Sequence, residues 1–305
     1  MSFKQHAPSS GELLPTFAAG TVIPKLIHQI YFNAQQEMPS VLQENIQKIR
    51  AMNPGWEHKV YDDREIADFI ATVYGRRVLE YFLRINPSYG AARADLFRYL
   101  LMYKRGGVYL DIKSTLIRPL DEVLLPDDVC ILSRWRNNSG GPFERWGRHA
   151  ALKQVGGNEF QQWHIVAAAG HPFLRAVSER VLQNIDRYNP VIHQTGAPGV
   201  LWTTGPVPYT LAITSLLPSC KYRLVGGHEE LGFVYSIFPP TAFEAHKTIF
   251  KHHYSQLTTP VVDVVGVKRV MWLVLGPLQI HVYRRLQRFV DAIERRARRW
   301  GFVRT

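Results

Sequence analysis

Two adjacent glycines, between a segment with helical spacing and a short β-branched segment, constrain this chain more than any other feature. Residues 88–105 predict a helix because apolar residues recur on one face: Ala92, Leu96, Tyr99, Leu100 and Tyr103. Gly106 and Gly107 follow, and glycine readily adopts the positive φ that ends a helix. The next residues, VYLDI, have the composition of a strand. We therefore expect a helix, a tight reversal and a strand that ends near Asp111.

The preceding residues predict the same alternation of strands and helices. Residues 22–32 are β-branched and aromatic and predict a buried strand, and residues 39–52 have helical spacing. EHKVYDD predicts a second strand, followed by a second helix in REIADFIATVY. Alternating strands and helices favour an α/β fold with a largely parallel sheet. We expect a lead-in over residues 1–20, one α/β domain over 21–260 and a basic helical tail over 261–305.

Three charged residues of the helix and strand are candidates for ligand binding. Asp95 and Arg98 are three residues apart, so they share one helix face. Asp111 lies at the carboxyl end of the expected strand, where open α/β sheets bind ligands. A carboxylate there can hold a divalent cation or a sugar hydroxyl, and a guanidinium can bind phosphate oxygens. An ion pair that closes the helix onto the sheet explains the same spacing, and spacing alone leaves both interpretations open.

At these residues the sequence resembles the glycosyltransferases with a DXD sugar-binding region, glycosyltransferase family 32. This group contains initiating mannosyltransferases, inositol-phosphoceramide mannosyltransferases and bacterial polysaccharide transferases. The resemblance rests on the run from Ala94 to Tyr99 followed by GGVYLD, and it extends over roughly residues 22–260. Further matching segments are IPKLIHQIYF, NPGWEHKVYDD, AAAGHPFL and TTGP.

The resemblance implies a GT-A fold, a Rossmann-like sheet flanked by helices that binds a nucleotide-sugar and a divalent metal, Mn²⁺ or Mg²⁺. It implies that Asp95 and Arg98 contact the donor, and that Asp111 contacts donor and metal. Tyr31 matches an aromatic residue that stacks on the base. His252 and His253 are the candidates for a histidine that completes the metal shell. The implied reaction is transfer of a hexose or N-acetylhexosamine, with retention, to a glycan or lipid-linked acceptor in cell-surface polysaccharide or glycolipid synthesis.

Lys113 departs from the family pattern, which has a second Asp at this position. Strand alternation predicts that Lys113 lies on the same face as Asp111. An ammonium cannot bind a metal, so two arrangements remain open. Either Asp111 and a histidine hold the ion together with the diphosphate and water, or Lys113 itself neutralises the leaving phosphate. A relative that binds the donor without catalysis is the third interpretation.

The charge of the chain favours anionic partners. Lys and Arg number 37 against 25 Asp and Glu, a formal net charge of +12. Residues 284–299 hold seven arginines and two acids, while Val282, Leu286, Phe289, Val290 and Ile293 recur at helical spacing. Such a helix can lie on an anionic membrane surface, or it can pack on the domain with a solvated basic face.

Two other classes of protein are less consistent with the sequence than a transferase. A nucleic-acid-binding protein suits the charge, but no RNA-binding aromatic motif or helix-turn-helix supports it. A nicotinamide-dependent oxidoreductase is disfavoured because no glycine fingerprint follows the first strand. The first residues lack the charged-then-apolar run of a signal peptide. We therefore expect a cytoplasmic enzyme of bacterial type, peripheral at the inner face of the membrane.

Overall fold

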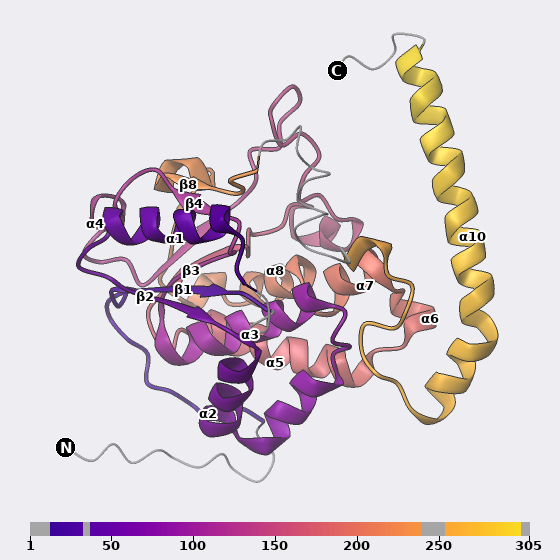
Figure 1. Ribbon diagram of the computed structural model, residues 1–305, viewed down its shortest axis with the longest axis horizontal. Coiled ribbons are helices and arrows are strands. Elements are labelled where there is room, and N and C mark those ends of the chain that lie inside the picture. The colour runs from indigo at the N-terminus through magenta and orange to yellow at the C-terminus, as the bar shows by residue number, and fades with distance from the viewer. Residues whose placement is uncertain (1–12, 33–36, 239–253, 300–305) are drawn as a thin grey trace.

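A six-stranded sheet in the order β2-β1-β3-β6-β5-β7 forms the centre of the computed structural model (Figure 1). The structure describes residues 13–32, 37–238 and 254–299. The strands of the sheet are β1 Leu26–Ile30, β2 Glu57–Tyr61, β3 Gly107–Leu110, β5 Cys130–Ser133, β6 His164–Ala167 and β7 Arg223–Val225. Adjacent strands are parallel except at β6, which runs antiparallel to both β3 and β5. The predicted α/β class with a mostly parallel sheet is confirmed.

Helices cover both faces of the sheet. The helices are α1 Ser40–Met52, α2 Asp63–Arg84, α3 Gly90–Arg105, α4 Leu120–Val123, α5 Pro172–Arg187, α6 Pro190–His193, α7 Gly196–Thr203, α8 Pro206–Thr214 and α10 Gly266–Arg299. Short 3₁₀ helices are η1 Ala150–Val155, η2 Leu217–Ser219, η3 His228–Leu231 and η5 Tyr254–Gln256. The larger core joins α2, α3, α5 and α8 to one face, whereas α1 and α4 pack on the other. Alternation along β3 follows this division, because Tyr109 lies in the first core and Val108 and Leu110 in the second.

The two glycines form the reversal that the sequence predicts. Gly106 has a φ of 65° and Gly107 a φ of 100°, both in the region that favours glycine. A Cβ atom on Gly106 would lie 2.4 Å from the backbone nitrogen of Ala169, and one on Gly107 would lie 2.5 Å from the carbonyl oxygen of Leu26. Both glycines are therefore required by close backbone packing as well as by conformation. This turn fixes where α3 lies relative to β3.

The strand after the glycines is shorter than the sequence predicts. β3 pairs with β6 only as far as Leu110, and the amide of Asp111 still donates to the carbonyl of Trp163 at 2.8 Å. The amide of Ser114 then donates to the carbonyl of Asp111 at 2.8 Å, which closes a turn. The expectation that alternation continues to Lys113 is wrong, because residues 111–114 form this turn. A two-stranded sheet follows, formed by β4 Thr115–Leu116 and β8 Phe233–Val234.

Segments near both ends of the chain contact the domain. Leu14, within the expected lead-in, is fully buried, and Phe17 packs against the same core. Val261 and Val262, at the start of the expected tail, are also buried there. α10 lies beside α6 at one side of the molecule and extends beyond it (Figure 1). Among the described helices, none combines the length and apolar character needed to cross a bilayer.

Candidate functional site

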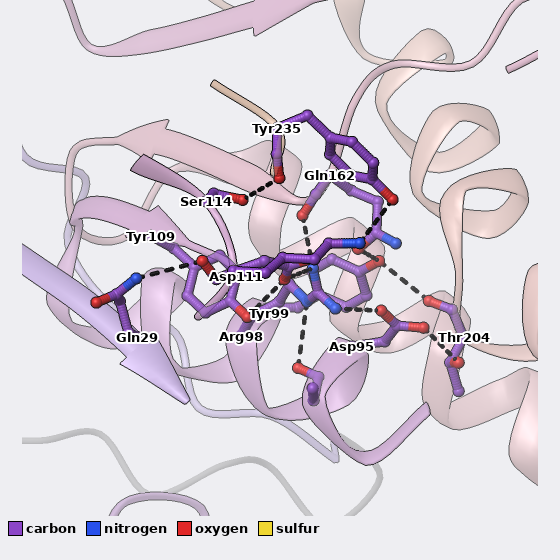
Figure 2. A network of polar contacts seen from close by, with 12 residues as sticks. Gln29, Asp95, Arg98, Tyr99, Tyr109, Asp111, Ser114, Gln162, Thr204 and Tyr235 are labelled. Carbon is purple, nitrogen blue, oxygen red and sulfur yellow. Dashed lines mark hydrogen bonds and ion pairs between the residues drawn. The ribbon is translucent and has the colours of Figure 1, made fainter. Parts of the chain in front are cut away.

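The guanidinium of Arg98 is the centre of a buried polar network at the carboxyl end of β3 (Figure 2). Its Nη2 donates to Asp95 Oδ1 at 2.6 Å, and its Nη1 donates to Asp111 Oδ1 at 3.0 Å. Nη1 also donates to the carbonyl of Gln162 at 2.9 Å, and Nε donates to the carbonyl of Ala94 at 3.3 Å. The structure therefore brings together the three residues that sequence spacing selected.

Asp95 and Arg98 are enclosed by protein. Their side chains are 3% and 5% exposed, and Thr204 donates its hydroxyl to Asp95 Oδ2 at 2.8 Å. Burial raises the pKa of Asp95, whereas Arg98 and Thr204 oppose that rise. Burial lowers the pKa of Arg98, but its neighbours Tyr109, Asp111 and Asp95 outweigh burial and raise it overall. A permanently charged Arg98 thus holds two carboxylates and ties α3 to β3.

Asp111 is the accessible member of the network. Its side chain is 25% exposed, and Oδ1 accepts hydrogen bonds from Arg98 and from the hydroxyl of Tyr109 at 3.0 Å. Burial raises the pKa of Tyr109 well above its usual value, so this hydroxyl stays protonated and donates. Gln29 on β1 donates to the carbonyl of Asp111 at 3.2 Å. Within the described part of the chain, no hydrogen bond occupies Oδ2, so this oxygen is free to meet a ligand.

Lys113 lies in the same turn and contacts Tyr235. Its Nζ donates to the Tyr235 hydroxyl at 2.8 Å and lies 4.1 Å from the centre of the Tyr235 ring. Ser114 fixes the Tyr235 backbone, because its hydroxyl donates to the Tyr235 carbonyl at 2.8 Å (Figure 2). A cation and a partly exposed carboxylate are therefore presented two residues apart. This pair can bind a ligand that carries both anionic and hydroxyl groups.

Aromatic rings extend from Tyr235 into a cluster beyond Lys113. Tyr235 makes edge contacts with three indole rings at centroid distances of 5.2 Å to Trp135, 5.6 Å to Trp146 and 5.4 Å to Trp163. Trp135 and Trp163 are buried, whereas Trp146 is 42% exposed. Trp163 is thus a core residue. Trp146 is the ring of the cluster that faces solvent.

The remaining sequence candidates differ in where they lie. Tyr31 is half-buried and packs beside Ile112, next to Asp111 in the turn. Its backbone amide donates to the carbonyl of Tyr61 at 3.0 Å, and burial raises its pKa. His252 and His253 lie outside the described residues. The described site therefore holds Asp95, Arg98, Asp111, Lys113 and Tyr31 around the ends of β1 and β3.

The side chains of the site can supply one ligand to a metal ion. Among the described residues, no group of three or more His, Cys, Asp or Glu side chains is arranged to hold a metal ion. Asp111 Oδ2 supplies one hard oxygen, which suits Mn²⁺ or Mg²⁺. Mg²⁺ commonly uses one or two carboxylates together with substrate phosphates and water. Asp111 thus fits as one ligand of an ion that a bound diphosphate also holds.

Sequence reasoning did not assign several residues of this network. Thr204 belongs to TTGP, a segment that marked the resemblance but received no role. Gln162 also joins the site, because its Oε1 accepts a hydrogen bond from Tyr99 at 2.9 Å. Tyr235 had no motif to identify it. Tyr109 lies two residues before Asp111, so strand alternation is consistent with the hydrogen bond between them.

Comparison with known proteins covers the part of the network that lies on α3 and at the end of β3. Residues 39–130 match the glycosyltransferase sugar-binding region containing a DXD motif. The chain is 28% identical over 185 residues to inositol phosphoceramide mannosyltransferase 3 of Schizosaccharomyces pombe, covering 61% of this chain and 43% of that protein. It is 29% identical over 137 residues to the initiation-specific α-1,6-mannosyltransferase of Candida albicans, covering 42% and 34%. The chain spans less than half the length of both relatives.

A solved structure, the PaToxG glycosyltransferase, aligns over 85% of this chain and 86% of its own, with 14% identity and a TM-score of 0.43. Residues 39–130, which match the sugar-binding region, contain α1 to β3 and thus Asp95, Arg98, Asp111 and Lys113. This part of the chain is thus similar to the glycosyltransferase sugar-binding region containing a DXD motif, and the two relatives are mannosyltransferases.

Proposed function

We propose that this protein transfers a sugar from a nucleotide-sugar to a glycan or lipid-linked acceptor, with retention at the anomeric carbon. The observation that carries the proposal is the Asp111 carboxylate, held through Oδ1 by Arg98 and Tyr109, while no described residue bonds its Oδ2. A carboxylate fixed in this way can bind a donor without reorganising during the reaction. The names of the two relatives favour mannose as the sugar, and the name of the first favours an inositol phosphoceramide as the acceptor.

Each residue of the site has a distinct part in the proposed mechanism. Asp111 Oδ2 binds the donor, while Arg98 and Asp95 position Asp111 from beneath rather than contacting the sugar, because both are buried. Lys113 lies beside them and attracts the diphosphate, whose negative charge grows as the glycosidic bond breaks. Tyr31 provides a ring for the base near the end of β1. A divalent ion on Asp111, when bound, supplies further neutralisation of the leaving diphosphate.

Retention follows from a front-face route in this proposal. Asp95 cannot act as a nucleophile because it is enclosed and already bonded to Arg98 and Thr204. The acceptor hydroxyl would therefore attack from the side of the departing diphosphate, whose oxygen receives the proton. Trp146 contacts Tyr235, which in turn contacts Lys113. The exposed face of Trp146 suits an acceptor sugar, since pyranose rings present C–H groups that pack on indole.

Donor hydrolysis tests the proposal directly. The full chain is incubated with GDP-mannose, UDP-galactose, UDP-glucose or UDP-N-acetylglucosamine, each with Mn²⁺, with Mg²⁺ and without metal, and the released nucleotide is measured. We expect one donor, GDP-mannose first, to be hydrolysed by the wild-type protein and not by Asp111→Ala. Release from none of the donors, together with no calorimetric binding of any, would overturn the proposal. Binding without release would instead indicate a relative that holds the donor and does not transfer it.

A further inference from the structure

The first half of α10 exposes apolar residues along one stripe. Val267, Val270, Val274 and Leu278 are spaced by three or four residues, and they are 75%, 60%, 68% and 63% exposed. This spacing places them on one helix face. The opposite side is tied to the domain, because Lys268 donates to the carbonyl of Asp186 at 2.8 Å and Gln279 to the carbonyl of Val191 at 3.0 Å. A continuous apolar face of this kind marks an interaction surface.

The sequence around this stripe limits what can cover it. Residues 270–283 contain no Asp, Glu, Lys or Arg, and as a helix they extend about 21 Å. A hydrocarbon core is roughly 30 Å thick, so this length suits insertion into one leaflet or its interface. Arg269 precedes the apolar run, and Arg284 and Arg285 follow it directly. Basic residues at both ends of a short apolar helix suit lipid headgroups, because long cationic side chains reach the headgroups from a buried stem.

The second half of α10 favours an anionic partner over a second copy of the chain. Residues 284–299 carry seven arginines against two acids. Two such helices side by side repel each other, whereas a surface of anionic lipid attracts both. Each basic residue near such a surface strengthens binding by about 1 kcal/mol. The apolar stripe alone would suit either a lipid surface or a second copy of the chain. The positive charge of residues 284–299 favours the anionic lipid surface.

We propose that α10 docks this protein on an anionic bilayer, with the stripe Val267, Val270, Val274 and Leu278 inserted below the headgroups. The arginines of residues 284–299 then hold the surface through electrostatic attraction. A cavity of about 680 Å³ between α10 and the α6–α7 region is lined by residues that include Trp272, Leu275 and Leu257, and Leu278, at the edge of the stripe, also lines it. This inference does not depend on the transferase activity, since it concerns lipid binding alone.

Vesicle co-sedimentation of the full chain tests the docking. We expect the wild type to bind vesicles of phosphatidylcholine and phosphatidylglycerol, and to bind pure phosphatidylcholine at least about tenfold more weakly. Raising the salt concentration should also weaken binding to the anionic vesicles. The variant Val270→Ser/Val274→Ser/Leu278→Ser should lose at least about tenfold in affinity for them. Its matched control is Ile117→Ser/Leu125→Ser/Leu224→Ser, in which three residues of 61%, 49% and 52% exposure change elsewhere; this control should bind like the wild type.

A second pair of variants tests the electrostatic part. Arg295→Gln/Arg296→Gln removes two positive charges from α10, and Arg76→Gln/Arg77→Gln removes two from the exposed surface of α2. Only the first pair should weaken vesicle binding and its salt dependence. Equal binding by the wild type and the apolar variant would overturn the proposal. Concentration-dependent dimerisation in sedimentation velocity, lost in the apolar variant while vesicle binding is absent, would also overturn it and assign the stripe to self-association.

Discussion

Arg98 Nη1 lies 3.0 Å from Asp111 Oδ1, which joins a fully enclosed guanidinium to a carboxylate that is one quarter exposed. The same nitrogen donates to the carbonyl of Gln162, so the guanidinium cannot turn toward a ligand without breaking two hydrogen bonds. This relationship divides the site into a rigid support and a ligand-binding surface. The support consists of Asp95, Arg98 and Thr204, and the surface consists of Asp111 and Lys113.

Removal of the accessible carboxylate is the most direct prediction. Asp111→Ala should lower kcat for donor turnover by about a hundredfold or more, because it deletes the charge that faces the donor. The free energy of unfolding should change far less, since Arg98 keeps Asp95 and two carbonyl partners. Donor turnover and urea unfolding give the two values. Glu80→Gln, an exposed acid paired with Arg76, is the control, and wild-type turnover in Asp111→Ala would remove Asp111 from the site.

Thr204 should act as a positioning residue. Thr204→Val keeps the side-chain volume but leaves Asp95 Oδ2 without its hydroxyl donor. A buried acceptor that loses its partner costs about 1–3 kcal/mol, and we expect a loss of stability in this range. If the network sets the orientation of Asp111, kcat should fall while KM for the donor changes little, and Thr204→Ser should restore both. Thr214→Val is the control because its hydroxyl donates to the carbonyl of Thr210 within its own helix. Loss of stability with unchanged kcat would assign Thr204 a purely structural role.

The sequence predicted the contacts among Asp95, Arg98 and Asp111, but it did not predict the residues that surround them. Spacing placed Asp95 and Arg98 on one helix face, and the glycine pair predicted the reversal that brings Asp111 beside them. Thr204 directly follows α7, more than a hundred residues along the chain from Asp95, so its contact depends on how α7 packs against α3. Tyr235 depends in the same way on the pairing of β8 with β4. Local periodicity carries no signal for either.

The end of β3 shows a different limit of sequence analysis. Residues 108–113 alternate in polarity throughout, so the pattern alone extends the strand to Lys113. The structure ends the strand at Leu110 and turns the chain, because Ser114 bonds back to the carbonyl of Asp111. An apolar–polar alternation is compatible with a turn as well as with a strand. Lys113 therefore reaches the site from a turn rather than from a strand face.

Lys113 should determine how strongly the site depends on a metal ion. Lys113→Asp supplies a second carboxylate at the position where the family has one, and it removes an ammonium that repels cations. We expect Mn²⁺ to bind at least about tenfold more tightly, as measured by calorimetry with the donor nucleotide present, and turnover to become more dependent on Mn²⁺. Lys153→Asp, an exposed lysine in η1, is the control. Identical Mn²⁺ titrations of wild type and Lys113→Asp would exclude Lys113 from the neutralisation of the diphosphate.

Trp146 should serve the acceptor rather than the donor. Trp146→Ala removes an indole that is 42% exposed and contacts Tyr235. Loss of one stacking surface should raise KM for the acceptor by about fivefold, given about 1 kcal/mol for an aromatic contact, and leave KM for the donor unchanged. Trp202→Ala, another indole with 48% exposure, is the matched control. Equal effects on donor and acceptor, or none on either, would contradict the assignment.

His28 should make the stability of the fold depend on pH. Its Nε2 lies 3.0 Å from the carbonyl oxygen of Gly106 and donates to it, so its Nδ1 accepts from the Tyr61 hydroxyl at 3.3 Å. This arrangement requires a neutral ring, and burial lowers the pKa of His28 to about 4 from an unfolded value of 6.5. Between these values the unfolded chain binds more protons than the folded one, so stability falls as pH falls from 6.5 toward 4.

The expected loss from His28 over that window is on the order of 3 kcal/mol, measured as the urea unfolding free energy at several pH values. His28→Gln can still donate to Gly106 and accept from Tyr61 but cannot titrate. This variant should therefore be less stable than the wild type near pH 7 and lose less stability on acidification. His193→Gln is the control, because that ring is only half-buried and lies on the short helix α6. An unchanged pH slope in His28→Gln would show that His28 does not carry the dependence, and that other buried rings such as His58, whose pKa burial also lowers to about 4, do.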